Sequence, residues 1–231
     1  MISVISFTAI GSRMRACVAS ALLAAAVSCD APSSTRPDFA YDPTTLSRGQ
    51  LYHWATGRQI SVWVELGTGL SAFDLGSAVR QAITTWNAVP QFAEFKLAMA
   101  SSISDADIVV YDRAIAAPVS AGTCTFDPQG SAGYTYFCPS GGSPATAQKL
   151  SLAAGGSTHV SVLIRVDRGR AIDQNGYIAL VTHEFGHALG IGGHSDLRTD
   201  LMFGLPAVTI PTARDRRTLQ YLLGRRPDIT L

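Results

Sequence analysis

The sequence predicts one domain with a mixed α/β (α+β) fold. Segments with the period of β-strands alternate along the chain with segments whose apolar residues recur at helical spacing. The chain has 231 residues, 47% of them hydrophobic and 15% charged, which is enough for one sizeable core with extensions. Both observations favour a single globular unit.

Three segments have the composition of strands. Gln59 to Leu66 and Val160 to Asp167 alternate apolar residues with more polar ones, as half-buried strands do. Asp105 to Tyr111 ends in a run of β-branched and aromatic residues, which is typical of a buried strand. We therefore expect these three segments in the sheet.

The first long helix is predicted from Ser71 to Val89. Ser71 and Asp74 have the spacing of a capping box, and Pro90 follows the expected end. Its apolar stripe consists of Leu75, Val79, Ala82 and Trp86.

A final helix is predicted near the C-terminus, where Thr212 and Asp215 form a second capping box ahead of the apolar run from Leu219 to Gly224. The basic cluster around this helix, which includes Arg214 and Arg226, is interpreted as a solvated face.

The candidate metal ligands and a candidate general base lie close together in the sequence between these two helices. His183 and His187 are four residues apart, so both imidazoles lie on one face of a helix and can bind one metal ion. Glu184 is placed to act on a water molecule at that ion as a general base. Gly190 ends the helix in a conformation that turns the chain, and His194 follows as a third possible ligand.

This run resembles the signature of the metzincin metalloproteases, HExxHxxGxxH followed by a methionine turn, and within them that of the matrixins. Gly193 stands where the family has its last histidine, and His194 follows one position later. We expect Gly192 and Gly193 to absorb the extra residue through backbone conformations closed to other residues. His194 is then the third ligand, and Asp196 is the alternative.

The resemblance extends over residues 59 to 224. It implies a zincin/metzincin-like fold, with a twisted mixed sheet packed on two long helices and an active-site helix followed by a methionine turn and a C-terminal helix. Met202 matches the methionine turn, a structural apolar floor below the metal that is not a ligand.

By this resemblance the chain is expected to be a zinc metalloendopeptidase with one catalytic zinc ion. Glu184 serves as general base and acid in peptide-bond hydrolysis by a zinc-activated water. No structural zinc or calcium site is recognised. The substrate peptide adds to an exposed sheet edge, for which we expect Lys149 to Ala153. Part of the specificity pocket is expected from the loop Phe203 to Ile210. The alternative is a non-catalytic zincin-like surface lipoprotein that binds peptide or matrix.

The N-terminus predicts export. Arg13 and Arg15 precede an apolar run from Ala16 to Ser28, which has the length of a signal-peptide core and is too short to span a bilayer. Translation can start at Met1 or at Met14. We expect a signal peptide at residues 1–28, a lipid-anchor cysteine and flexible linker at 29–50, and the catalytic domain at 51–231.

Cys29 ends a sequence that resembles a bacterial lipobox, so we expect its lipidation and an extracytoplasmic, membrane-anchored protein of the cell envelope. The alternative is ordinary cleavage and free secretion. Of the remaining cysteines, Cys124 and Cys138 are the candidates for a disulfide in an oxidising compartment, and free thiols or metal ligands are the alternative.

Charge excludes one class of partner. Eighteen basic and 17 acidic side chains leave a net charge of +1, which gives no electrostatic basis for nucleic-acid binding. The expected partner is a peptide or protein substrate. The membrane is contacted only through the N-terminal lipid, and the protein is expected to be a monomer.

Overall fold

A computed structural model describes residues 39–67, 73–90, 93–120, 130–141 and 145–231. Residues Asp38 to Leu231 form one compact unit. The predicted signal peptide, Cys29 and Cys124 lie outside the described residues, so cleavage, lipidation and the disulfide stay predictions. No helix within the described ranges is both long and apolar enough to cross a bilayer.

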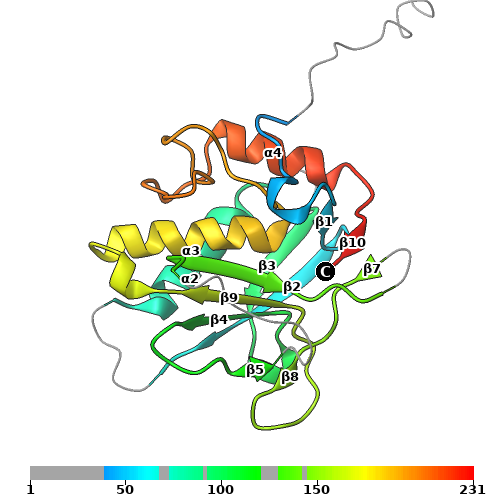
Figure 1. The fold of residues 1–231 in the computed structure, drawn as a ribbon, viewed down its shortest axis with the longest axis vertical. Coiled ribbons are helices and arrows are strands. Elements are labelled where there is room, and N and C mark those ends of the chain that lie inside the picture. The colour runs from blue at the N-terminus through cyan, green and yellow to red at the C-terminus, as the bar shows by residue number, and fades with distance from the viewer. Residues whose placement is uncertain (1–38, 68–72, 91–92, 121–129, 142–144) are drawn as a thin grey trace, which may run out of the picture. The chain divides into compact units, whose positions relative to one another are not determined.

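The prediction of a mixed α/β fold with a mixed sheet is confirmed (Figure 1). The five-stranded sheet has the order β3-β2-β4-β9-β6. Its strands are parallel except β6, which runs antiparallel to β9. The strands are β2 (Arg58–Glu65), β3 (Phe95–Met99), β4 (Ile108–Asp112), β6 (Gly133–Phe137) and β9 (Val162–Val166).

The described residues contain three α-helices, α2 (Leu75–Asn87), α3 (Gln174–Leu189) and α4 (Ala213–Leu223). Helices α2 and α3 pack against each other, and both contact the sheet. The capping box of Thr212 and Asp215 at the start of α4 is confirmed. Helix α2 begins later than predicted, because Asp74 is itself the N-cap and accepts a hydrogen bond from the Ser77 amide at 2.9 Å.

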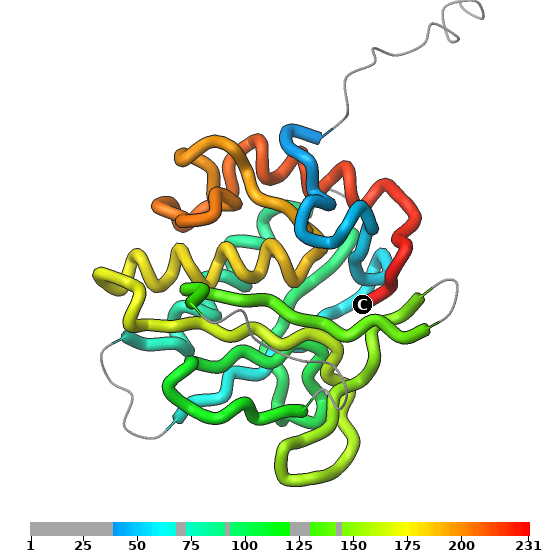
Figure 2. Tube along the Cα trace, viewed as in Figure 1, coloured from blue at the N-terminus to red at the C-terminus, as the bar shows by residue number. Residues whose placement is uncertain are grey.

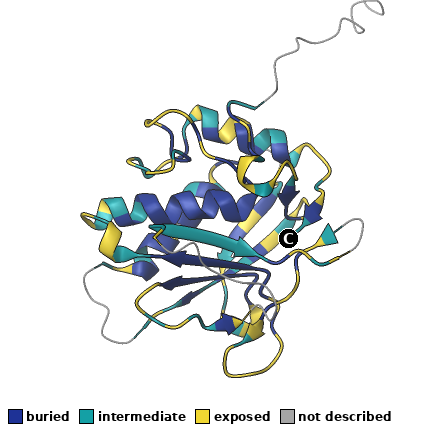
Figure 3. Cartoon of the chain, in the orientation of Figure 1, coloured by how far each residue is buried: buried dark blue, intermediate teal, exposed yellow. Residues whose placement is uncertain are grey.

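Burial on both faces of the sheet accounts for the apolar sequences of its central strands. Figure 3 shows α3, β4 and β9 mostly in the colour of buried residues. One face of the sheet packs with α2 and α3 in the main core, and the other face of β4 and β9 is covered by a smaller cluster that includes Val119 and Leu150. Strands buried on both faces carry continuous apolar runs, as the sequences of β4 and β9 do.

Small strands complete the unit. A three-stranded parallel sheet has the order β1-β10-β7, and β5 pairs with β8 in a two-stranded sheet. These strands are β1 (Tyr52–His53), β5 (Val119–Ser120), β7 (Ala145–Thr146), β8 (Ser151–Leu152) and β10 (Ile229–Thr230). Single 3-10 turns occur at η2 (Thr45–Ser47), η3 (Ile103–Asp105) and η4 (Arg168–Arg170).

The prediction that Lys149 to Ala153 forms the exposed edge of the sheet is wrong. Its central residues form β8, which pairs with β5 outside the main sheet, and β6 is the edge strand beside α3. The physical reason is that Leu150 is buried in the smaller cluster on the outer face of the sheet. This contact holds the segment away from the helix face.

Residues 39–50, expected as part of a flexible linker, instead pack on the compact unit. Tyr41 is buried, and its hydroxyl donates to Asp215 of α4 at 2.9 Å. The Leu46 amide donates to the carbonyl of Gly192 at 2.6 Å. In Figure 2 this blue segment runs beside the orange and red C-terminal part of the chain. The N-terminal segment, as we call residues 39–50, therefore belongs structurally to the domain.

Candidate metal centre

Helix α3 positions the first two histidines. Asp173 caps its start by accepting a hydrogen bond from the Gly176 amide at 2.7 Å, and Gly190 ends it with a φ of 127°. Within the helix, His183 and His187 lie on one face, and their Nε2 atoms are 3.1 Å apart. The helical spacing thus produces the paired imidazoles that the sequence predicted.

His194 joins them from the loop that follows α3. Its Nε2 lies 3.2 Å from Nε2 of His187, and one nitrogen from each of the three histidines lies within 4.8 Å of the others. These three side chains could hold a metal ion. Asp196, the alternative ligand, is not in this group; its carboxylate accepts a hydrogen bond from Arg214 at 2.5 Å.

Backbone carbonyls fix the orientation of two rings. Nδ1 of His183 lies 2.7 Å from the carbonyl oxygen of Leu201, and Nδ1 of His187 lies 2.6 Å from that of Ile191. A carbonyl only accepts, so each Nδ1 carries the proton and each neutral ring presents the lone pair of Nε2 to the centre of the cluster.

Burial keeps the rings neutral. It lowers the pKa of His183 to about 4 and also lowers the pKa values of His187 and His194. Neutral imidazole is the metal-binding form. The Nε2 lone pairs of His183 and His187, which face each other at 3.1 Å, repel one another unless a cation lies between them.

The spacing fits a tetrahedral ion. Zinc–nitrogen bonds of about 2.0–2.1 Å at the tetrahedral angle place two ligand nitrogens about 3.3 Å apart. The observed separations of 3.1 and 3.2 Å between the Nε2 atoms are close to this value. The three imidazole nitrogens and these two separations therefore fit a metal ion that favours nitrogen ligands in tetrahedral geometry.

The loop before His194 is tightly packed. The expectation that Gly192 and Gly193 need special backbone conformations is wrong, because Gly190 alone among these glycines has a positive φ. Gly192 and Gly193 are required instead because a side chain at either position would clash with its neighbours. A Cβ on Gly193 would lie 2.1 Å from the carbonyl oxygen of Asp42, and one on Gly192 would lie 2.7 Å from Cε1 of Tyr52. The extra residue before the third histidine thus lies under the N-terminal segment.

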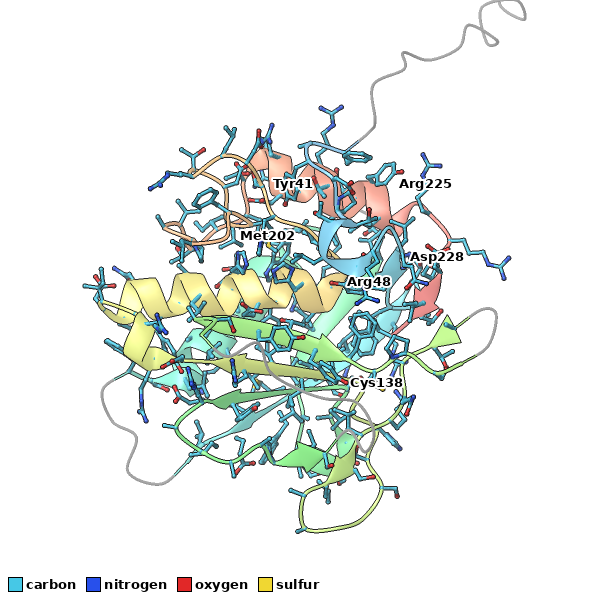
Figure 4. The ribbon with its side chains drawn as sticks, viewed as in Figure 1. Tyr41, Arg48, Cys138, Met202, Arg225 and Asp228 are labelled. Carbon is cyan, nitrogen blue, oxygen red and sulfur yellow. The ribbon has the colours of Figure 1, made fainter. Side chains whose placement is uncertain are left out.

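Met202 packs against the helix that carries the ligands. It is fully buried, and a Cβ on Gly186 would lie 2.3 Å from its sulfur. Its carbonyl accepts from the Ser195 amide at 2.8 Å. The loops on both sides of His194 and Met202 are therefore linked directly. Figure 4 shows Met202 and Tyr41 on the side of α3 where α4 lies.

Asp215, which the sequence identified only as a helix cap, also anchors the Met202 loop. Its carboxylate is fully buried and accepts from the backbone amides of Leu201 and Met202 at 3.0 and 3.3 Å. Because the Leu201 carbonyl accepts from His183, this carboxylate supports one of the candidate ligands.

Glu184 lies beside the metal cluster and points toward β6. It is 4% exposed, and burial raises the pKa of its carboxyl from 4.5 to about 8. The Thr135 hydroxyl contacts it at 2.7 Å. A carboxyl whose pKa lies near neutrality is suited to exchange protons with a reacting group.

The cluster opens into a cleft of about 690 Å³. Strand β6 borders it on one side, and Gly204 to Pro206 and the N-terminal segment form other parts of its wall. Of the predicted pocket loop Phe203 to Ile210, Gly204, Leu205 and Pro206 line the cleft. Sequence reasoning missed Thr135 and Arg48 as lining residues, because neither belongs to a local pattern that indicates a site.

No family model matches the chain, and a search of the curated proteins found no match. The geometry of the centre and the sequence motif are therefore the basis of the functional argument.

Proposed function

We propose that this protein is a zinc-dependent endopeptidase of the metzincin type, similar to the matrixins. One observation carries the proposal. His183, His187 and His194 bring one nitrogen each within 4.8 Å of the others, next to a buried carboxyl and at the wall of a cleft large enough for a peptide. Zinc is the expected ion, since it favours tetrahedral sites with three histidines and one open position.

The arrangement of elements supports this reading. A mixed sheet packs on α2 and α3, the second of which carries the candidate ligands, and the buried Met202 packs against this helix at Gly186. These features agree with the zincin/metzincin-like fold implied by the sequence resemblance.

The chain supplies binding, orientation and proton transfer. His183, His187 and His194 would hold the zinc ion, which would supply Lewis acidity toward the scissile carbonyl and toward the attacking water. Glu184 accepts the proton of the attacking water and delivers it to the leaving amine. Strand β6 is the last strand of the sheet within the described residues, so its edge opposite β9 can pair with the main chain of an extended peptide.

Replacement of Glu184 tests this assignment. The Glu184→Ala variant keeps all three imidazoles, so it should contain as much zinc as the wild type and lose nearly all peptide hydrolysis. His194→Ala should lower zinc affinity and hydrolysis together, whereas Asp196→Ala should change neither by more than about twofold. Undiminished cleavage by Glu184→Ala would contradict the proposal.

A further inference from the structure

Strand β6 presents alternate residues to the helices. Thr135 is in register with Ile164 of β9, which is in register with Val110 of β4. Ile164 and Val110 belong to the core that packs on α2 and α3. Since side chains alternate along a strand, Thr135 and Gly133 face α3, and Tyr134 lies on the other face.

Thr135 contacts Glu184 twice. Its Oγ1 lies 2.7 Å from Oε2 of Glu184 and 2.9 Å from the backbone carbonyl of the same residue. A threonine hydroxyl has one proton to donate, so both acceptors share it. The contact ties the side chain of Glu184 to its own backbone through a residue of the edge strand.

Gly133 provides the space for this carboxyl. A Cβ at position 133 would lie 2.3 Å from Oε1 of Glu184 and 2.8 Å from its Cδ, closer than atoms that are not bonded can approach. The Glu184 side chain therefore occupies the volume that any other residue at position 133 would need.

We propose that Thr135 and Gly133 form a cradle that holds the Glu184 carboxyl in the one orientation in which it can exchange protons with the reacting groups. The inference rests on the proposed peptidase function. Thr135 acts through Glu184 and is a positioning residue. A glutamate side chain without such contacts samples several rotamers, and misplacing a catalytic group by about 1 Å costs on the order of 100-fold in rate.

Substitutions at Thr135 test the cradle. Thr135→Val keeps the shape and the strand propensity of the residue and removes the hydroxyl, and Thr135→Ser keeps the hydroxyl. We expect Thr135→Val to lower kcat by about 10- to 100-fold with KM and zinc content within twofold of wild type, and Thr135→Ser to recover most of the loss. Gly133→Ala should also lower kcat, because it displaces the carboxyl.

The Thr135 substitutions need a matched control. Thr84→Val, on the exposed surface of α2, removes a threonine hydroxyl elsewhere and should retain wild-type kinetics. Unchanged kcat in Thr135→Val, or a Thr135→Ser variant as slow as Thr135→Val, overturns the cradle and leaves the peptidase proposal intact. A wild-type chain that binds zinc and cleaves no peptide overturns both proposals.

A separate observation concerns charge in the cleft. Among the described residues that line the cleft, Arg48 is the only one with a permanently charged side chain. The other acidic or basic groups there are the three histidines and Glu184. It is exposed, has a left-handed φ of 56°, and has no carboxylate partner within the described ranges. Figure 4 shows it near the C-terminal end of α3, which carries His187.

We infer that Arg48 selects substrates with an acidic side chain at one position. Arg48 lines the same cleft as the three histidines, so a side chain of a peptide bound along this cleft can reach it. This inference also rests on the proposed function. An exposed cation attracts a carboxylate modestly and in a salt-dependent way.

The test uses pairs of peptides that differ only by Glu or Gln at a single position, with this position moved stepwise along the peptide on both sides of the cleaved bond. At one position the wild type should cleave the Glu peptide with about three- to fivefold higher kcat/KM. Arg48→Gln should abolish the preference, and Arg226→Gln, an exposed control that does not line the cleft, should keep it. Equal cleavage of every pair by the wild type, or a preference that persists in Arg48→Gln, overturns the inference and leaves the peptidase proposal standing.

Discussion

Replacing Asp215 by asparagine should destabilise the whole metal centre. The Oδ2 atom of Asp215 accepts from the amides of Leu201 and Thr212 at 3.0 and 2.8 Å and from the Thr212 hydroxyl at 2.9 Å. Its Oδ1 accepts from the Met202 amide at 3.3 Å and from the Tyr41 hydroxyl at 2.9 Å. Every donor around this buried carboxylate therefore needs an acceptor, and asparagine supplies only one oxygen.

The expected cost follows from these contacts. If the amide oxygen takes the place of Oδ2, the new NH2 group faces the Met202 amide, which loses its acceptor at a cost of about 1–3 kcal/mol. The remaining bonds change from charge-assisted to neutral, which costs about 1 kcal/mol more. We expect Asp215→Asn to lower the free energy of unfolding by about 3 kcal/mol, a large part of the 5–15 kcal/mol typical of a domain.

Urea denaturation in the presence of a chelator measures this loss. Asp196→Asn is the control, because its carboxylate pairs with the same network through Arg214 while its side chain is 75% exposed, and it should cost less than about 1 kcal/mol. Zinc affinity should fall in Asp215→Asn, since the Leu201 loop orients His183. A free energy of unfolding within about 0.5 kcal/mol of wild type would contradict this role of Asp215, because ordinary surface substitutions cause changes of that size.

Three further substitutions test the packing of the N-terminal segment and the burial of Glu184. Gly193→Ala places a Cβ 2.1 Å from the carbonyl oxygen of Asp42, so calorimetry should show weaker zinc binding and a loss of about 1–3 kcal/mol in stability; unchanged zinc affinity would contradict the packing argument. Tyr41→Phe removes one donor to Asp215 and should lower the free energy of unfolding by about 1 kcal/mol in urea titrations; an unchanged midpoint would count against that bond. In the metal-free chain, burial raises the pKa of Glu184 from 4.5 to about 8, so the folded state binds this proton more tightly than the unfolded state. The resulting stability is fully present below pH 4.5 and is lost as the pH rises through 8. Between pH 5 and 8 the free energy of unfolding should therefore fall by about 3 kcal/mol more in the wild type than in Glu184→Gln. Equal pH dependence of the two proteins in urea denaturation would disprove this prediction.

Local pattern explains which parts of the site could be predicted. His183, Glu184 and His187 lie in one helix, where spacing alone fixes their relative positions. The capping box of Thr212 and Asp215 is likewise a short-range feature. His194 was predicted despite its shifted position, and the structure brings it into the cluster.

Contacts between distant segments explain what could not be predicted. Thr135 reaches Glu184 across 49 residues, and Tyr41 reaches Asp215 across 174. No local periodicity encodes such pairs. The composition of the N-terminal segment resembles a linker, yet its backbone fills the space that Gly192 and Gly193 leave open.

The zinc peptidase proposal can be tested by incubating the purified chain with a diverse peptide mixture, measuring the zinc content of the same sample and locating the cut sites by mass spectrometry. We expect one zinc per chain and cuts within the peptides. This cleavage should disappear when a chelator removes the metal and return when zinc is restored. A chain that carries zinc on these three histidines and cuts no peptide would contradict it, as would cleavage that continues after the metal has been removed.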